Sequence, residues 1–200
     1  PYEMGYQYGH LMRLEVKAFI PELIATAQAL EPVRFSNANL DSAWELAVNP
    51  DYADERFAQE LRGLAAGVAG SSSQSADWEL KLRRAHMILA LDKASCSSFA
   101  AWRSATANGD LLQTQNVDSA LLFDAGAYRH PAIVVYIPDE GVPHVNATFA
   151  GFVGSFTGMN LAGITLSAVG NPVAGQEYQV DDLHGEDYTS MLRGILYDAH

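Results

Sequence analysis

One residue of this sequence offers covalent chemistry from a single position: Cys96, in the run Ala-Ser-Cys-Ser-Ser-Phe at residues 94–99. A cysteine thiolate is a strong nucleophile that can attack an amide carbonyl and hold the acyl group as a thioester. A lone cysteine is more often a small buried apolar residue. Here, however, helical sequence changes to strand sequence, and a residue at the start of a strand can face a cleft. Cys96 is therefore the candidate nucleophile.

Histidine is the usual base for a catalytic thiol, and the histidines of this chain show no motif spacing. No HxH, HExxH or HxxxH pair is present, so the spacing favours neither a Cys–His pair nor a histidine metal site. A single cysteine also excludes an intrachain disulfide and disfavours a cysteine-based zinc site. The six histidines are His10, His86, His130, His144, His184 and His200.

A second activation route needs no histidine. If the chain is cut before Cys96, the α-amine of the cysteine is freed. Such an amine has a pKa of about 7.7–8.0 and can act as a base near neutral pH. The same logic operates in enzymes with an N-terminal threonine. The route requires a carboxylate or amide to orient the amine, and hydrogen-bond donors to hold the oxyanion.

Composition narrows the class of protein. The 200 residues are 48% hydrophobic and 18% charged, which is enough for a packed core. The net charge of −12 argues against nucleic acid or an anionic membrane as a partner, because phosphates would be repelled. No apolar run reaches the roughly 18 residues of a membrane span, and no signal peptide is recognisable. The compartment stays open between cytoplasmic and exported.

Before residue 95 the apolar residues recur every three or four positions, which is typical of helices. We expect helices at residues 12–30 with a kink or break at Pro21, from 51 or 54 to 70, and at 78–91. The Ser-Ser-Ser-Gln-Ser run at 71–75 is predicted to be a flexible connector.

After residue 95 the pattern changes to strands. Asn108-Gly109 is a strong signal for a two-residue hairpin turn. We expect strands at 98–104, 111–117, 132–137, 145–153 and 163–169, and a last helix at 187–199. This order predicts an α+β fold with helices packed on antiparallel sheets. The chain lacks an initiator Met and the last helix lacks a stop signal, so we expect a longer natural polypeptide.

Three blocks of the sequence match a known pattern. Residues 96–102 (CSSFAAW), 105–109 (ATANG) and 111–118 (LLQTQNVD) form the first, 151–165 (GFVGSFTGMNLAGIT) the second and 3–9 (EMGYQYG) the third. Together they resemble the N-terminal nucleophile (Ntn) hydrolases, and within them the family of acyl-coenzyme A:6-aminopenicillanic acid (isopenicillin-N) acyltransferase. The match spans most of the chain, and its first block is the most specific.

The resemblance implies part of an αββα Ntn sandwich, with its C-terminal part missing, preceded by a helical pro-segment. Residues 1–95 would be the pro-segment and residues 96–200 the N-terminal part of the catalytic domain. Cleavage would fall between Ser95 and Cys96, and Cys96 would be the nucleophile for both self-cleavage and turnover. Ser95 stands where the family usually has glycine.

The resemblance also implies roles for other residues. Asp118 matches the aspartate that orients the α-amine. Asn171 is the first choice for the oxyanion donor and Asn160, in the Gly-Met-Asn block, is the second. Gln115 stands where the penicillin acyltransferase branch has glutamine and related amidases have arginine, and we assign it to substrate binding.

Phe99 and Trp102 are assigned to the substrate pocket, with ordinary core packing as their alternative. The implied function is a self-processing amidohydrolase or acyltransferase that acts on a small N-acyl or peptide-like amide, with hydrolysis favoured over transfer. No metal or organic cofactor is needed, and the cut pro-segment would remain as a heterodimer partner. Two alternatives stay open: an uncut, non-catalytic protein of the same fold, and a Cys–His thiol hydrolase with a histidine within reach of Cys96.

Overall fold

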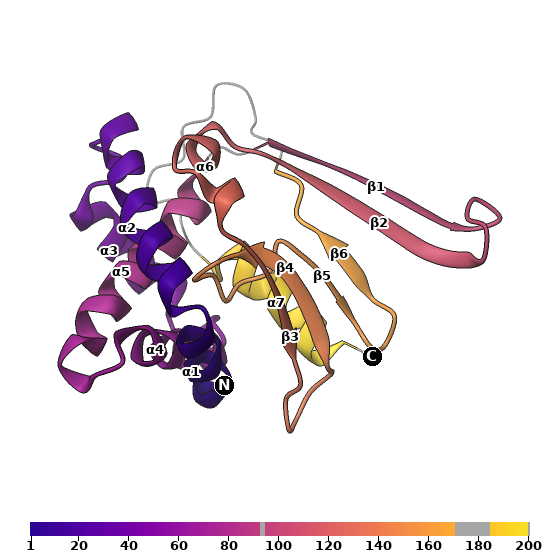
Figure 1. The fold of residues 1–200 in the computed structure, drawn as a ribbon, viewed down its shortest axis with the longest axis horizontal. Helices are drawn as coiled ribbons and strands as arrows, with labels where there is room; N and C mark the ends of the chain where they lie inside the picture. Colours follow the sequence, from indigo (N-terminus) through magenta and orange to yellow (C-terminus); the bar gives the residue numbers. More distant parts are fainter. Residues whose placement is uncertain (93–94, 171–184, 200) are drawn as a thin grey trace.

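The computed structural model describes residues 1–92, 95–170 and 185–199. Helices fill the first part of the chain, a long hairpin follows, and a four-stranded sheet with a helix on one face completes it (Figure 1). The protein therefore has the expected α+β class. The helices are α1 (Tyr2–Leu11), α2 (Arg13–Leu30), α3 (Asn37–Ala47), α4 (Glu55–Ala69), α5 (Ser72–Leu91), α6 (Ala120–Asp124) and α7 (Tyr188–Asp198), with a 3-10 turn at Ala127–Arg129. The strands are β1 (Ser95–Arg103), β2 (Gly109–Asp118), β3 (Pro131–Tyr136), β4 (His144–Phe149), β5 (Thr157–Asn160) and β6 (Thr165–Ser167).

Helices α1 and α4 pack with their backbones in direct contact. The contact is made by glycines spaced four residues apart on each helix, Gly5 and Gly9 on α1 and Gly63 and Gly67 on α4. A Cβ atom added at any of these positions would lie 1.9–2.3 Å from a backbone carbonyl oxygen of the other helix. Only glycine permits so close an approach, and small residues at this spacing are a known device for it.

The predicted helices are present, with two corrections. Helix α2 continues through Pro21, and the break lies instead at Met12, between α1 and α2. The prediction that the serine-rich run is a flexible connector is wrong, because Ser71 is the N-cap residue of α5 and the rest of the run forms the first turn of that helix. Serine is favoured at helix N-termini as well as in loops, and this explains the error. Helix α3, capped by the Ser36 side chain, was not predicted.

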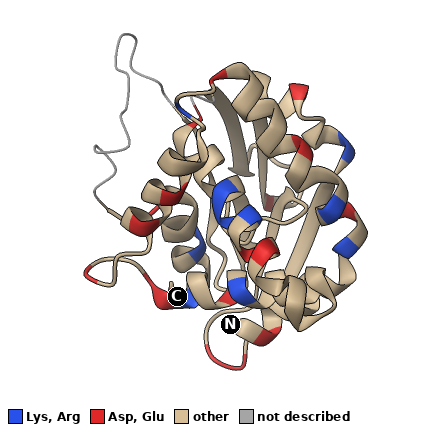
Figure 2. Ribbon diagram, turned by 90° about the vertical axis from the view of Figure 1, so that its left-hand side faces the viewer, with Lys and Arg blue, Asp and Glu red and all other residues tan. Residues whose placement is uncertain are grey.

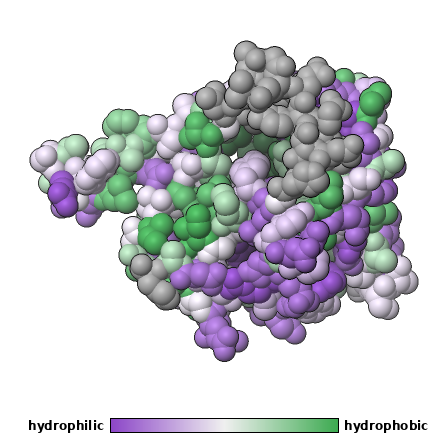
Figure 3. All heavy atoms as spheres, turned by 180° about the vertical axis from the view of Figure 1, so that it is seen from behind, coloured by the Kyte–Doolittle hydropathy of each residue, from purple (hydrophilic) through white to green (hydrophobic). Residues whose placement is uncertain are grey.

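Strands β1 and β2 form an antiparallel hairpin that projects from the body of the molecule (Figures 1 and 3). Ser95 pairs with Asp118 and Cys96 with Val117, so the base of the hairpin holds the candidate nucleophile. The hairpin was predicted, but its turn is longer than the two residues of Asn108-Gly109. The strands are joined by residues 104–108, and Gly109 begins β2 with a φ of +79°.

The second sheet is an antiparallel meander in the order β3-β4-β5-β6. Side chains alternate across its faces, so Ala132 and Tyr136 are buried whereas Ile133 and Val135 are exposed. Helix α7 covers one face (Figure 1), where its Leu196 is fully buried and lies against Gly158 of β5.

The segments before and after Cys96 share one hydrophobic core. Its buried residues run from Tyr8, Phe19 and Leu64 in the helices to Leu122 in α6 and Phe152 after β4. The boundary expected at residue 95 is thus a change of element type and does not divide this core. In the described ranges 1–92, 95–170 and 185–199, no helix has both the length and the apolarity needed to cross a membrane.

Candidate functional site

A cavity of about 390 Å³ opens beside Cys96. It lies where the base of the hairpin meets the end of α5, α6, the end of β6 and the first turns of α7. This volume is within the range of about 300–1,000 Å³ that is usual for small-molecule sites. Its lining residues are Leu89, Asp92, Cys96, Val117, Leu122, Phe156, Ser167, Ala168, Val169, Gly170, Tyr188, Met191 and Leu192.

Cys96 is half-buried and lies on the face of the hairpin that borders the cavity. Directly paired residues share a face, and faces alternate along each strand, so Cys96, Val117 and Gln115 lie on the same side. Gln115 anchors this side, because its Nε2 donates a hydrogen bond to the Ala168 carbonyl oxygen at 2.6 Å. The predicted substrate-binding glutamine thus fixes the hairpin against the cavity wall beyond β6.

Asp118 lies on the opposite face of the hairpin from the thiol, since it pairs with Ser95. Asn116 holds it, with Nδ2 donating to the Asp118 carboxylate at 3.1 Å. The Ser95–Cys96 peptide nitrogen lies in the strand backbone, between the two faces. This arrangement does not suit a direct contact between Asp118 and the thiol.

The polar groups of the cavity include Asp92 and Tyr188, which the sequence did not single out. Ser119 donates a hydrogen bond to the Asp92 carboxylate at 2.7 Å and also caps α6. Burial raises the pKa of Tyr188, and the nearby acidic side chains of Asp187 and Asp92 raise it further. Tyr188 is therefore a neutral hydroxyl at neutral pH. Only the tertiary contacts could have revealed it, because it lies 92 positions from the cysteine.

Two of the histidines are engaged with groups other than the thiol. In His86 one ring nitrogen is 2.8 Å from the Leu82 carbonyl oxygen, and the other accepts from the Val153 amide at 3.2 Å. Burial lowers the pKa of His86 to about 4, so the ring is neutral. His130 contacts Glu15 at 2.6 Å. His144 belongs to the polar network described next, and the ring of His10 stacks on that of Tyr6. His184 and His200 lie outside the described residues.

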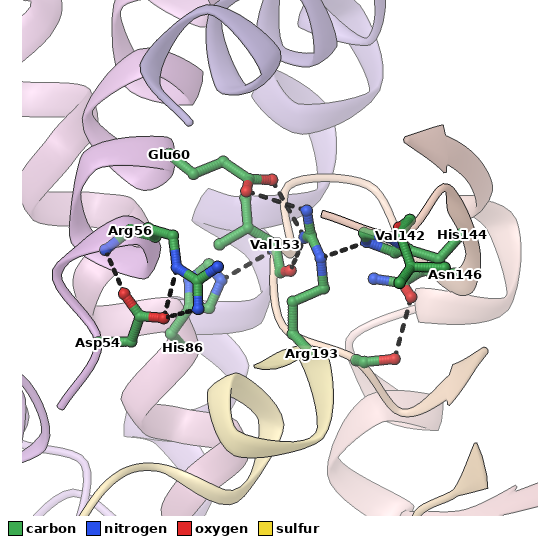
Figure 4. A network of polar contacts seen from close by, with 10 residues as sticks. Asp54, Arg56, Glu60, His86, Val142, His144, Asn146, Val153 and Arg193 are labelled. Carbon is green, nitrogen blue, oxygen red and sulfur yellow. Dashed lines mark hydrogen bonds and ion pairs between the residues drawn. The ribbon is translucent and has the colours of Figure 1, made fainter. Parts of the chain in front are cut away.

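A buried polar network joins the helical segment to the rest of the chain (Figure 4). The Arg193 guanidinium of α7 donates to both oxygens of Glu60 in α4, at 3.2 and 3.1 Å, and to the Val153 carbonyl oxygen at 2.7 Å. Its Nε donates to His144 Nε2 at 2.7 Å, and the Tyr136 ring lies 3.6 Å from its central carbon. Burial and the Arg193 charge lower the pKa of His144 to about 4.

Asn160 has a structural role. Its Nδ2 donates to the carbonyl oxygens of Leu196 and Ala199, at 3.2 and 2.9 Å, and its Oδ1 accepts from the Ile164 amide at 3.0 Å. These contacts lie at the C-terminal end of α7, whereas its N-terminal turns line the cavity. Because both amide hydrogens are used, we do not retain Asn160 as an oxyanion donor. Asn171 lies outside the described residues.

Phe99 and Trp102 lie along the projecting part of the hairpin. Their exposed fractions are 67% and 54%, and neither lines the cavity. Leu111 and Leu112 of β2 are also exposed, so the projecting part of the hairpin carries several exposed apolar side chains. From this position they do not line the space where a substrate would lie beside Cys96.

Charges of both signs are interspersed over the helical side of the molecule (Figure 2). Several are paired, as Arg84 is with Asp41 at 2.8 Å. Within the part of the chain that the structure describes, no three histidine, cysteine, aspartate or glutamate side chains gather as a group that could hold a metal ion.

Comparisons with known proteins place the chain among longer relatives. No family model matches it. It is 32% identical to protein dcd1B of Dictyostelium discoideum over 179 residues, covering 78% of this chain and 34% of that protein. It is also 29% identical to an uncharacterized protein of Archaeoglobus fulgidus, covering 83% of this chain and 30% of that one, and 26% identical to dcd1A of D. discoideum, covering 79% and 40%. The chain thus spans about a third of the length of these curated relatives.

Proposed function

We propose that the protein is a cysteine Ntn amidohydrolase or acyltransferase that is activated by cleavage before Cys96. The observation that carries the proposal is the position of Cys96 at the start of β1, beside a 390 Å³ cavity and paired with the strand that ends in Asp118. The sequence block over residues 96–118 supports it.

The fold supports the proposal at the level of layers. In an αββα sandwich each sheet is covered by helices on one face and by the other sheet on the second. Here α7 covers one face of the four-stranded sheet, while the second face exposes Ile133, Val135 and Met159. An exposed apolar sheet face is what a missing second layer would cover.

Activation would begin with attack of the Cys96 thiol on the Ser95 carbonyl carbon. The C–N bond breaks as the C–S bond forms, and the thiol proton moves to the leaving amine. Water then hydrolyses the thioester, which frees the Ser95 carboxylate and the Cys96 thiol. Ser95 is exposed, so water can reach this peptide. The product is a chain that begins with Cys96 and carries a free α-amine.

In turnover the α-amine would take the thiol proton, and the thiolate would attack the amide carbonyl of a small N-acyl or peptide-like substrate. The amine returns the proton to the leaving nitrogen, which leaves an acyl-thioester on Cys96. Water resolves it in a hydrolase, and a second amine does so in a transferase. Asp118 orients the α-amine, and Asn171 is the proposed oxyanion donor.

The helical segment would stay bound after cleavage. Its core is continuous with that of the catalytic part, and the Glu60–Arg193 pair crosses between the two pieces with side chains only 6–7% exposed. Separation would expose this core and leave buried charges unpaired. The two pieces would therefore behave as a heterodimer.

One observation favours a second candidate, an uncut ligand-binding protein of the same fold. The Ser95–Cys96 peptide lies within strand β1, and the only non-glycine residue with a positive φ in the described ranges is Arg103. Neither a left-handed backbone conformation nor a cis peptide bond is thus present at Ser95 to promote an N→S acyl shift.

Denaturing mass spectrometry separates the two candidates. The wild-type chain should give two pieces that meet between Ser95 and Cys96, and Cys96→Ala should stay whole. Ser98→Ala is the matched control, because it changes a neighbour on the same strand face and leaves the thiol in place. A wild-type chain that stays whole after long incubation refutes self-processing.

Turnover is tested on the cleaved protein. A substrate amide should add its acyl mass to the piece that begins with Cys96, and hydroxylamine should remove it. Asp118→Asn should slow this acylation, whereas Asp124→Asn, an exposed aspartate on α6, should not. Equal rates in both variants would contradict the orienting role of Asp118.

A further inference from the structure

The walls of the cavity beside Cys96 are mainly aliphatic. They come from elements far apart in the sequence: α5, β2, α6, the loop before β5 and α7. The apolar lining includes Leu89, Val117, Leu122, Phe156, Met191 and Leu192. The polar side chains in the lining are Asp92, Cys96, Ser167 and Tyr188, and among these Asp92 is the carboxyl group.

Building on the proposed function, we propose that this cavity binds the acyl part of the substrate as an uncharged aliphatic chain, with the scissile carbonyl at the Cys96 thiol. The walls offer an extended acyl chain contact with leucine, valine and methionine side chains on several sides. A carboxylate on the chain would lose its hydration among these side chains.

The size of the effect follows from burial of the chain. Each buried methylene contributes about 0.8 kcal/mol, which corresponds to roughly a fourfold gain in binding. The reactivity of Cys96 towards a series of acyl analogues should therefore rise roughly fourfold with each added methylene until the cavity is filled. A chain that ends in a carboxylate should lose this gain.

Met191 is the residue best placed to set the chain length. It lies on the first turns of α7, lines the cavity and is 47% exposed, so it borders the mouth. A tryptophan there would fill space inside the cavity with little effect on the core. Ile195, one turn further along the same helix and 40% exposed, does not line the cavity and provides a matched control.

The single cysteine makes a direct test possible, because Cys96 is the only thiol in the sequence. Straight-chain alkyl chloromethyl ketones of increasing length place a carbonyl and an alkyl chain at the thiol; the sulfur–carbon bond forms and chloride leaves. The labelling rate of the folded wild type, divided by the rate in guanidinium, should rise with chain length. Met191→Trp should lower the ratio of octyl to methyl labelling on the order of tenfold, and Ile195→Trp should leave it unchanged.

Ratios that do not depend on chain length, or that fall equally in both tryptophan variants, would overturn the aliphatic-chain proposal. So would faster labelling by the ω-carboxylated ketone than by the alkyl ketone of equal length. These rates do not require self-cleavage or amide turnover. An uncut chain that still prefers long alkyl ketones would refute the proposed enzyme and leave the cavity's specificity standing, and a cleaved enzyme that prefers short or anionic acyl groups would do the reverse.

Discussion

Replacement of Arg193 by methionine tests how the helical segment is held to the rest of the protein. The guanidinium makes two hydrogen bonds to Glu60, and one each to His144 and the Val153 carbonyl oxygen. Arg193→Met keeps much of the side-chain volume and removes every one of these donors. The Glu60 carboxylate, in a residue only 5% exposed, is left without its cation.

The expected cost can be worked from this environment. Removal of one partner of a buried ion pair costs about 3–5 kcal/mol, because the remaining charge stays buried. A domain is typically stable by only about 5–15 kcal/mol, so this is a large fraction of the total. For a chain of this length, 1 kcal/mol corresponds to a change in melting temperature of roughly 2–4 °C. Arg193→Met should thus lower the melting temperature by about 6–20 °C.

A second arginine provides the control. Arg56 pairs with Asp198 at 2.6 Å, but these side chains are 37% and 57% exposed. Exposed pairs contribute about 0–1 kcal/mol, because water solvates the charges when the pair is broken. Arg56→Met should therefore lower the melting temperature by no more than a few degrees.

The assay is thermal and urea denaturation followed by circular dichroism, with the double variant Glu60→Leu/Arg193→Met measured beside the single ones. Removal of both charges should recover part of the lost stability, since no carboxylate is then left buried. The hydrogen bonds to His144 and Val153 stay lost in the double variant, so recovery should be incomplete. Equal losses in Arg193→Met and Arg56→Met, or no recovery in the double variant, would refute the reasoning.

Three further predictions concern stability. Gly63→Ala should destabilise the protein by about 1–3 kcal/mol or more, because its Cβ would lie 2.0 Å from a carbonyl oxygen of α1. Gly194→Ala should stabilise the protein by about 0.5–1 kcal/mol, because the added Cβ would stand in open space. Urea midpoints of the two variants that move in the same direction would contradict this. Burial lowers the pKa of His86 from 6.5 to about 4, so the unfolded chain binds a proton at a higher pH than the folded protein does. The free energy of unfolding should therefore fall as the pH is lowered from 6.5 towards 4, by at most about 1.4 kcal/mol per pH unit. His86→Gln should make this pH dependence weaker in denaturation curves. Phe99→Ser, at a side chain that is 67% exposed, should change the free energy of unfolding by less than about 0.5 kcal/mol and leave the rate of thiol labelling unchanged.

Local sequence patterns predicted most of the elements, because helix and strand periodicity depends on near neighbours. The apolar spacing before residue 95 and the alternation after it predicted α2, α4, α5 and the hairpin. One error lies where a residue type serves two local structures. Ser71–Ser75 has the composition of a loop and also that of a helix N-terminus, and the packing of α5 selects the second.

The sequence by itself determined the candidate nucleophile, the strand that pairs with it and the acid that ends that strand. These are properties of one contiguous block, residues 96–118, and strand pairing across a short hairpin follows from local chain geometry. Tertiary structure decided which groups surround the thiol. Asp92, Phe156, Tyr188 and Met191 meet Cys96 at one cavity only because elements far apart in the chain pack there, and no spacing along the chain encodes contacts of such long range.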